Sequence, residues 1–339
     1  MSKNETVEEF DRLVRRDPAG RGLIGTEQQR GALCPGHLAA AAVELADSAG
    51  RVVIVTGFFI PHGEPPAAET DGPPGAVTLG RVLADLGHDV VLVTDEPCAG
   101  ATRAAVLEAG LPGSCVEEAP LQGTADWCEN FLQRAAGSPL SHLVAIERVG
   151  PSHDPVSLQR QAREGSAPVE LFEERVPRSS WGCCHNMRGE VIDEWTADIS
   201  PLFDRLTEFS PEATSIGIGD GGNEIGMGSV PWEELVARLP GEHSLRIPCR
   251  IATDWTLVAG ISNWGAWALS AAVAVCAGRP DVIEPLTGAW QRGLVERMVA
   301  DGPAVDGPSG KAMVGVDGLP IEDYLHVWQE IREMLGWSS

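Results

Sequence analysis

Apolar segments of two kinds alternate along the first half of the chain. Runs of strand length rich in β-branched residues recur as RVVIVTG (51–57), DVVLVTDE (89–96) and HLVAIERVG (142–150). Helical stretches lie between them at about 75–87, 100–109 and 124–136. Two later runs, ATSIGIG (213–219) and CRIATDW (249–255), resemble the first three. Because strands separated by helices at this spacing favour right-handed crossovers, we predict an α/β fold with a mostly parallel sheet flanked by helices.

The remaining predicted helices differ in how far their apolar residues spread around the helix. Val7, Phe10, Leu13 and Val14 share helical spacing and predict a short docking helix. In SNWGAWALSAAVAVCA (262–277) apolar residues cover most of the circumference, which predicts a buried helix. The final stretch, LPIEDYLHVWQEIREML (319–335), is amphipathic, and we expect it to pack on the outside of the sheet.

Residues 151–183 interrupt this rhythm. The segment is charged and rich in proline, so we interpret it as an insertion, a lid or a linker. We therefore treat 1–339 as a single region that can be divided into lobes at 1–150 and 184–339.

Composition and charge narrow the classes of partner. A formal net charge of −24 argues against nucleic acid and anionic membranes, because phosphate surfaces would be repelled. An anionic ligand would need a local cation or arginine inside its pocket. The N-terminus, MSKNETVEEFDRLVRRD, has no apolar import signal, and eight scattered cysteines favour reduced thiols, so we expect a cytoplasmic location. Composition leaves a monomer and a homo-oligomer both open.

The stretch SIGIGDGGNEIGMG (215–228) is the first candidate for chemistry, because six glycines surround two acids and an amide. It contains a GxGxxG match, but Asp220 would repel the pyrophosphate of a dinucleotide. We favour a loop that aims Asp220, Asn223 and Glu224 at the carboxyl edge of the sheet, where α/β folds bind ligands. Such oxygen ligands suit Mg²⁺ or Mn²⁺. A purely structural turn is the alternative.

Three further loops have the same predicted position at the sheet edge. The loop 57–76 carries Glu64, Glu69, Asp71 and His62 before a proline-started helix, although an ordinary turn would look the same. Glu147 and Arg148 end a strand. They could belong to the site, or they could form a surface ion pair that contributes little. Asp254 ends CRIATDW, and Ser262 and Asn263 open the buried helix, where Ser262 could be only its N-cap.

The chain resembles the D-glutamate cyclase family, the C-terminal catalytic region of mitochondrial D-glutamate cyclase and its stand-alone microbial relatives. The resemblance rests on stretches that span about 51–320: TGF (56–58), EPP (64–66), ETDGPPGA (69–76), LVAIER (143–148), GIGDGGNEIGMG (217–228), AGISNWGAWAL (259–269) and VDGLP (316–320). GIGDGGNEIGMG and ETDGPPGA are long and unusual. The resemblance implies a lyase that dehydrates D-glutamate, an acidic amino acid, to 5-oxo-D-proline.

For such a reaction we hypothesise roles at the four loops, around a shared acidic cleft. Glu147 is the general base and Arg148 clamps the α-carboxylate. The remaining residues would hold a divalent metal (Asp71, Asp220, Glu224 and Asp254) or orient substrate or oxyanion (Asn223, Ser262, Asn263, Gly72, Gly221 and Gly222).

Two other functions stay open on the sequence. The same acids could activate water in a metal-dependent phosphohydrolase. The chain could also be a non-catalytic protein that binds an acidic amino acid, with 151–183 as its lid.

Overall fold

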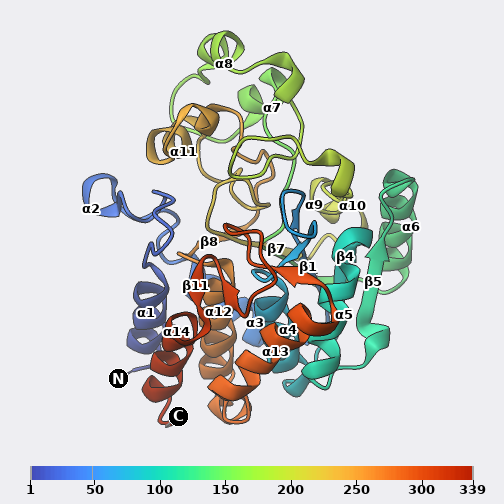
Figure 1. The fold of residues 1–339 in the computed structure, drawn as a ribbon, viewed down its shortest axis with the longest axis vertical. Helices are drawn as coiled ribbons and strands as arrows, with labels where there is room; N and C mark the ends of the chain where they lie inside the picture. The colour runs from blue at the N-terminus through green and yellow to red at the C-terminus, as the bar shows by residue number, and fades with distance from the viewer. Residues whose placement is uncertain (1, 48, 338–339) are drawn as a thin grey trace.

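A computed structural model describes residues 2–47 and 49–337 (Figure 1). Its main sheet has six strands, all parallel, in the order β5-β4-β1-β6-β7-β8. These strands are β1 (Arg51–Thr56), β4 (Asp89–Asp95), β5 (Val116–Ala119), β6 (Leu140–Ile146), β7 (Thr214–Gly219) and β8 (Trp255–Val258). A parallel sheet flanked by helices confirms the predicted α/β fold.

Small sheets and helices complete the described chain. β2 (Phe59–Ile60), β3 (Ala67–Glu69) and β9 (Ala304–Val305) form one small sheet, and β10 (Gly315–Val316) pairs with β11 (Leu319–Pro320). The α-helices are α1 (Lys3–Val14), α2 (Glu27–Arg30), α3 (His37–Asp47), α4 (Pro73–Asp85), α5 (Ala99–Glu108), α6 (Thr124–Gly137), α7 (Pro155–Arg160), α8 (Val169–Arg175), α9 (Pro201–Asp204), α10 (Leu206–Phe209), α11 (Trp232–Arg238), α12 (Ser262–Cys276), α13 (Gly288–Asp301) and α14 (Ile321–Met334).

The main sheet separates two hydrophobic cores, because successive side chains of a strand point to opposite faces. Val52 and Ile54 of β1 belong to the core that includes residues of α1, α3, α4, α5, α12, α13 and α14. Val53 and Val55 belong to the opposite core, with residues of α6, α9, α10 and α11. Both faces of the strands are thus covered, as is usual for parallel sheets.

The buried helix predicted at 262–277 is α12, in which Ser262 to Val275 are all buried. Its Trp267 contacts the rings of Tyr324 and Trp328 on α14. The amphipathic C-terminal helix therefore packs on α12, one layer outside the sheet. Among residues 2–47 and 49–337, every helix falls short of the length or apolar character that a bilayer crossing requires.

Residues 151–183 contain α7 and α8, which lie with α11 beyond the carboxyl edge of the main sheet (Figure 1). Leu158, Phe172, Val176 and Trp232 form a small hydrophobic core of their own there. We call residues 151–183, with α7 and α8, the upper region, and this separate hydrophobic core holds its helices together and against α11.

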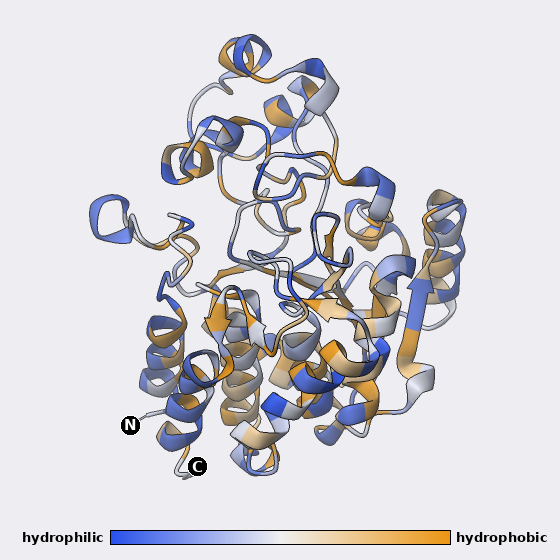
Figure 2. Ribbon diagram, in the orientation of Figure 1, coloured by the Kyte–Doolittle hydropathy of each residue, from blue (hydrophilic) through white to orange (hydrophobic). Residues whose placement is uncertain are grey.

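Two sequence expectations about strands need correction. β5 was not predicted, because its sequence VEEA mixes apolar and acidic residues, as its colour change in Figure 2 shows. It lies at an edge of the sheet, where acidic side chains reach solvent. The predicted strand 249–255 is wrong over most of its length, since β8 begins at Trp255. Backbone N–H groups of 249–254 instead bond to loops, such as Arg250 to Pro151.

The chain between α1 and α2 lies tightly against the turn that precedes α12. Gly260 N donates to Val14 O at 2.9 Å, and a Cβ at Gly260 would lie 1.5 Å from Arg16 O. Arg16 also pairs with Glu330 of α14. A glycine is needed at 260 because the two backbones touch there.

We predict that Gly260→Ala lowers the free energy of unfolding by about 1–3 kcal/mol, because the added methyl group overlaps the 16–18 backbone. Urea unfolding followed by circular dichroism measures this change. Gly137→Ala is the matched control, since no atom lies within 4 Å of a Cβ at that position. Equal stability of the two variants would contradict the close contact.

Candidate active site

Loops from separate parts of the chain bring three carboxylates together at the carboxyl edge of the sheet. Asp71 lies between β3 and α4, Glu147 follows β6, and Asp220 follows β7. All three are buried, and one oxygen from each lies within 4.8 Å of the other two. We call these residues the carboxylate trio.

The N-terminus of α12 holds the trio in place. Asp71 accepts hydrogen bonds from Ser262 N at 3.0 Å and Asn263 N at 2.9 Å, and Ser262 N also lies 3.2 Å from Asp220 Oδ2. The first N–H groups of a helix lack partners within the helix and favour negative charge. The residues predicted to open the buried helix are therefore the donors that bind two members of the trio.

Glu147, the second member of the trio, binds the hydroxyl group of Ser262. Ser262 Oγ donates to Glu147 Oε2 at 2.5 Å, and Glu147 has a φ of +46°, which is uncommon outside glycine. Burial raises the pKa of Glu147 well above its ordinary value, and Asp220 and Glu224 raise it further. Glu147 therefore has a high proton affinity for a carboxylate.

Three charged residues beside the trio were given no role on the sequence, although Glu69 was noted among the acids of loop 57–76. Arg21 Nη1 lies 2.5 Å from Asp220 Oδ2, and the same guanidinium bonds both oxygens of Asp317 at 2.6 and 2.5 Å. Glu69, at the end of β3, is also buried, and burial, Asp317 and Asp71 raise its pKa. Asp317 lies in VDGLP, whereas Arg21 lies in a glycine-punctuated segment without a recognisable motif.

The electrostatics favour capture of a proton or a cation. Burial and Asp317 raise the pKa of Asp71 to about 7, and burial outweighs Arg21 in raising the pKa of Asp220. Buried carboxylates repel each other unless they bind protons or a cation. Clustered oxygen donors of this kind suit Mg²⁺ or Mn²⁺.

Glu224 lies outside the trio because it folds back into its own loop. Its carboxylate accepts from Asp220 N at 3.2 Å, Gly221 N at 2.6 Å and Gly222 N at 2.7 Å. Those two glycine amides, predicted to bind substrate, are thus occupied by Glu224. The loop is compact because the backbones of Gly217 and Gly226 meet without side chains.

The two asparagines and Gly72 mainly bind protein groups. Asn263 Oδ1 accepts from Gly72 N at 3.0 Å and Gly75 N at 2.7 Å, so it ties the start of α4 to α12. Asn223 Nδ2 donates to His185 O at 2.8 Å, whereas its buried Oδ1 has no hydrogen-bond partner among the described residues. Of Asn223, Asn263 and Gly72, it is therefore Asn223 that has a polar atom free to bind a ligand.

The hypothesis that Arg148 clamps a substrate carboxylate is contradicted by its contacts. Arg148 is 1% exposed and donates to Asp95 Oδ2 at 2.6 Å, Gly57 O at 2.9 Å and Ala197 O at 2.7 Å. The side chain points into the protein from the end of β6. Arg148 therefore joins β4, the loop after β1 and the segment before α9.

The predicted metal ligand Asp254 lies at the opposite edge of the sheet. Because β8 begins at Trp255, Asp254 precedes its strand, and its Oδ2 accepts from Ser215 N at 2.8 Å and Ser215 Oγ at 2.6 Å. Asp220 lies beyond the other end of β7. A strand of that length separates the two carboxylates by roughly 15 Å.

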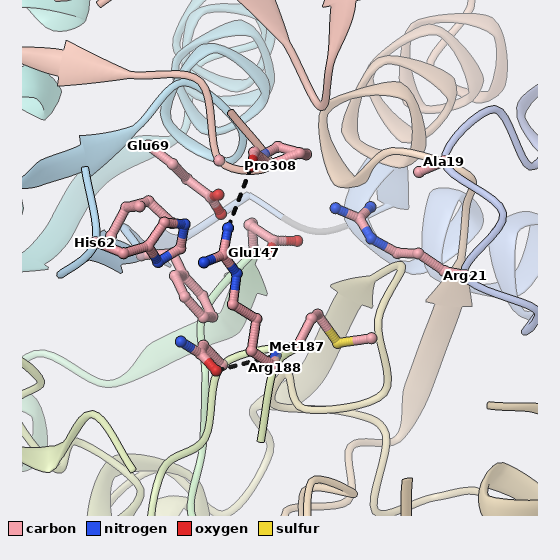
Figure 3. Close-up of a pocket in the computed structure, with 12 residues that line it drawn as sticks. Ala19, Arg21, His62, Glu69, Glu147, Met187, Arg188 and Pro308 are labelled. Atoms are coloured by element: carbon pink, nitrogen blue, oxygen red, sulfur yellow. Dashed lines mark hydrogen bonds between the residues drawn. The ribbon is translucent and has the colours of Figure 1, made fainter. Parts of the chain in front are cut away.

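A cavity of about 270 Å³ adjoins the trio (Figure 3). Glu69 and Glu147 contribute to its wall, and His62 and Arg188 extend into it. The complete lining is Ala19, Arg21, Phe58, Ile60, His62, Glu69, Glu147, Asn186, Met187, Arg188, Gly307 and Pro308. Glu147 is therefore the member of the trio that faces the cavity.

Comparison with known proteins identifies the family. The model described as "D-glutamate cyclase-like, C-terminal" matches residues 10–163 and 159–332. The chain belongs to this family. It is also 29% identical over 350 residues to "D-glutamate cyclase, mitochondrial" of Homo sapiens, a match that covers 95% of this chain and 50% of the human protein. The chain thus spans about half the length of this curated relative of the D-glutamate cyclase-like family.

We predict that Arg148→Gln lowers the free energy of unfolding by about 3–5 kcal/mol, because it leaves Asp95 buried without its partner. Urea unfolding measures the change. Arg205→Gln is the control, since Arg205 forms exposed ion pairs with Glu129 and Glu208 and should change stability little. Unchanged stability of Arg148→Gln would show that the buried ion pair is not a structural requirement.

We also predict that the protein without divalent metal loses stability between about pH 4 and pH 7, the interval between the ordinary and the folded pKa of Asp71. The folded pKa of Asp71, about 7, lies above its ordinary value of 3.8, so the stability from its bound proton is fully present below about pH 4 and is lost as the pH rises through 7. Thermal unfolding in EDTA should show a falling melting temperature. Mg²⁺ or Mn²⁺ should raise the melting temperature more at pH 8 than at pH 5.

The control for this prediction compares how the melting temperature of two variants changes with pH, rather than how stable the variants are at one pH. Asp71→Asn removes the titrating group and should flatten the dependence. Asp254→Asn, at the opposite edge of the sheet, should leave it as in the wild type. Identical pH profiles for wild type and Asp71→Asn would contradict the assignment.

Proposed function

We propose that this protein is a D-glutamate cyclase, which converts D-glutamate to 5-oxo-D-proline by intramolecular dehydration. Its family membership and its identity to the human cyclase support this function. The observation that carries the proposal is the buried carboxylate trio, bound by the N-terminus of α12 beside a small cavity. The cavity is of a size that suits a small amino acid.

The reaction sets three requirements. The α-amine attacks the carbon of the γ-carboxylate, a C–N bond forms, a C–O bond breaks, and the oxygen leaves as water with two protons that the ammonium nitrogen gives up. The ammonium group must first lose a proton, and the negative charge of the γ-carboxylate must be neutralised because a carboxylate is a poor electrophile. The two ends of the substrate must also be held together in the geometry for ring closure.

Glu147 is the general base in this proposal. It faces the cavity, and its raised pKa makes its ionised form a stronger base than an exposed carboxylate. The Ser262 hydroxyl holds one of its oxygens, which fixes the carboxylate plane. Asn223 remains a candidate for orienting the substrate through its uncommitted Oδ1.

The trio also fits a divalent metal. Asp71 and Asp220 would supply oxygen donors to one Mg²⁺ or Mn²⁺ ion and would leave the second oxygen of Glu147 free to accept the proton. The chemical contribution of the ion when bound would be to neutralise charge on the γ-carboxylate. Arg21, already paired with Asp220, reduces the repulsion between the carboxylates. This protein-borne cation is part of the site whether the trio binds a metal or protons.

The decisive assay is chiral detection of 5-oxoproline after incubation with D-glutamate or L-glutamate. Parallel reactions contain EDTA, Mg²⁺ or Mn²⁺, so the metal requirement is measured at the same time. We expect product from D-glutamate. Release of phosphate from phosphate esters without 5-oxoproline would favour a phosphohydrolase, and binding of D-glutamate without product would favour a non-catalytic protein.

We predict that Glu147→Gln and Asp220→Asn each lower kcat by about 10²–10⁴-fold, because an amide cannot accept the proton or provide the same negative charge. Steady-state assays of 5-oxoproline formation measure this loss. Asp254→Asn is the matched control and should retain wild-type kcat. Circular dichroism confirms that the compared variants are folded, and wild-type turnover by folded Glu147→Gln would exclude Glu147 as the base.

A further inference from the structure

The turn that follows the upper region presents Arg188 at its tip. Asn186 Oδ1 accepts from Arg188 N and Glu190 N, each at 3.0 Å, and Gly189 N donates to Asn186 O at 2.9 Å. Asn186 is itself buried, and Gly189 has a φ of +74°. These bonds define the backbone position from which the Arg188 side chain extends into the cavity (Figure 3).

The charge of Arg188 is not neutralised by this chain. Among the described residues the Arg188 guanidinium makes one hydrogen bond, a long one of 3.4 Å from Nη2 to Pro308 O, and this partner is a carbonyl rather than a carboxylate. The other arginine of the cavity, Arg21, is paired with both Asp220 and Asp317. Arg188 therefore has guanidinium donors available for a ligand.

An anion that enters this cavity meets strong repulsion. The chain has a net charge of −24, and both Glu69 and Glu147 line the cavity. A local cation is needed to attract a carboxylate against that field. A guanidinium can do so with two parallel hydrogen bonds to the same carboxylate.

We propose that Arg188 binds the α-carboxylate of the substrate and thereby selects amino acids with a free α-carboxylate. This inference rests on the proposed function. In that reaction the amine and the γ-carboxylate must both lie at Glu147 and the rest of the trio. The α-carboxylate is then the charged group left to meet the cation at the cavity wall, a role that Arg148 cannot perform from its buried position.

The test compares two substrates and three forms of the protein. D-Glutamate has both carboxylates, whereas D-isoglutamine carries an amide in place of the α-carboxylate and can still cyclise through its γ-carboxylate. We expect Arg188→Gln to lower kcat/KM for D-glutamate by about 10- to 100-fold, mainly through KM, the effect of a lost charged hydrogen bond. The same substitution should leave kcat/KM for D-isoglutamine within about twofold of wild type.

Arg188→Lys and Arg160→Gln complete the set. Lysine keeps the charge without the planar fork, so Arg188→Lys should have an intermediate kcat/KM for D-glutamate. Arg160→Gln removes one exposed positive charge from α7, outside the cavity, and should match the wild type for both substrates. This control separates local recognition from a change in net charge.

The outcomes distinguish this inference from the proposed function. If the wild type forms 5-oxoproline and Arg188→Gln is unaffected, or loses both substrates equally, recognition of the α-carboxylate by Arg188 is wrong and the cyclase function stands. If the wild type forms no 5-oxoproline, the cyclase function is wrong, and calorimetric titration with D-glutamate and D-isoglutamine tests Arg188 directly. Preferential binding of D-glutamate that disappears in Arg188→Gln supports the inference, and its absence overturns it.

Discussion

The structure depends on burying several carboxylates at one edge of a parallel sheet. Asp71, Glu147 and Asp220 converge there, with Glu69 and Asp317 beside them. Their repulsion is opposed by the Arg21 guanidinium and by the N–H groups that begin α12. Such a site has a high affinity for protons or a cation because removing charge relieves the repulsion.

This constraint explains features that lie outside the site. The chain after α1 must pass close to α12 for Arg21 to reach its two partners, and Gly260 leaves room for that passage. Arg238 of α11 holds the following segment, since its guanidinium donates to Leu23 O at 3.0 Å and Gly31 O at 2.9 Å. The N-terminal segment is therefore part of the site's architecture.

The arginines illustrate how burial and pairing assign different tasks to one residue type. Arg148 is buried with Asp95 and holds three segments together, and Arg21 is buried between acids of the site. Arg188, on the turn that follows the upper region, extends into the cavity, and its guanidinium bonds only the carbonyl of Pro308 among the described residues. The family model matches nearly the whole chain, so both the main sheet and the upper region belong to the unit that this family model describes.

The hydropathy pattern by itself determined most strands of the sheet, the buried helix α12, and the loops that carry Asp71, Glu147, Asp220 and Ser262. These are local properties, set by periodicity and by the rule that parallel strands end at one edge. Only the tertiary structure decided which acids meet: Asp254 precedes a strand that starts later than predicted, and Glu224 binds its own loop. Arg21 and Asp317 pair across 296 residues of sequence, and no local pattern encodes a contact of that range.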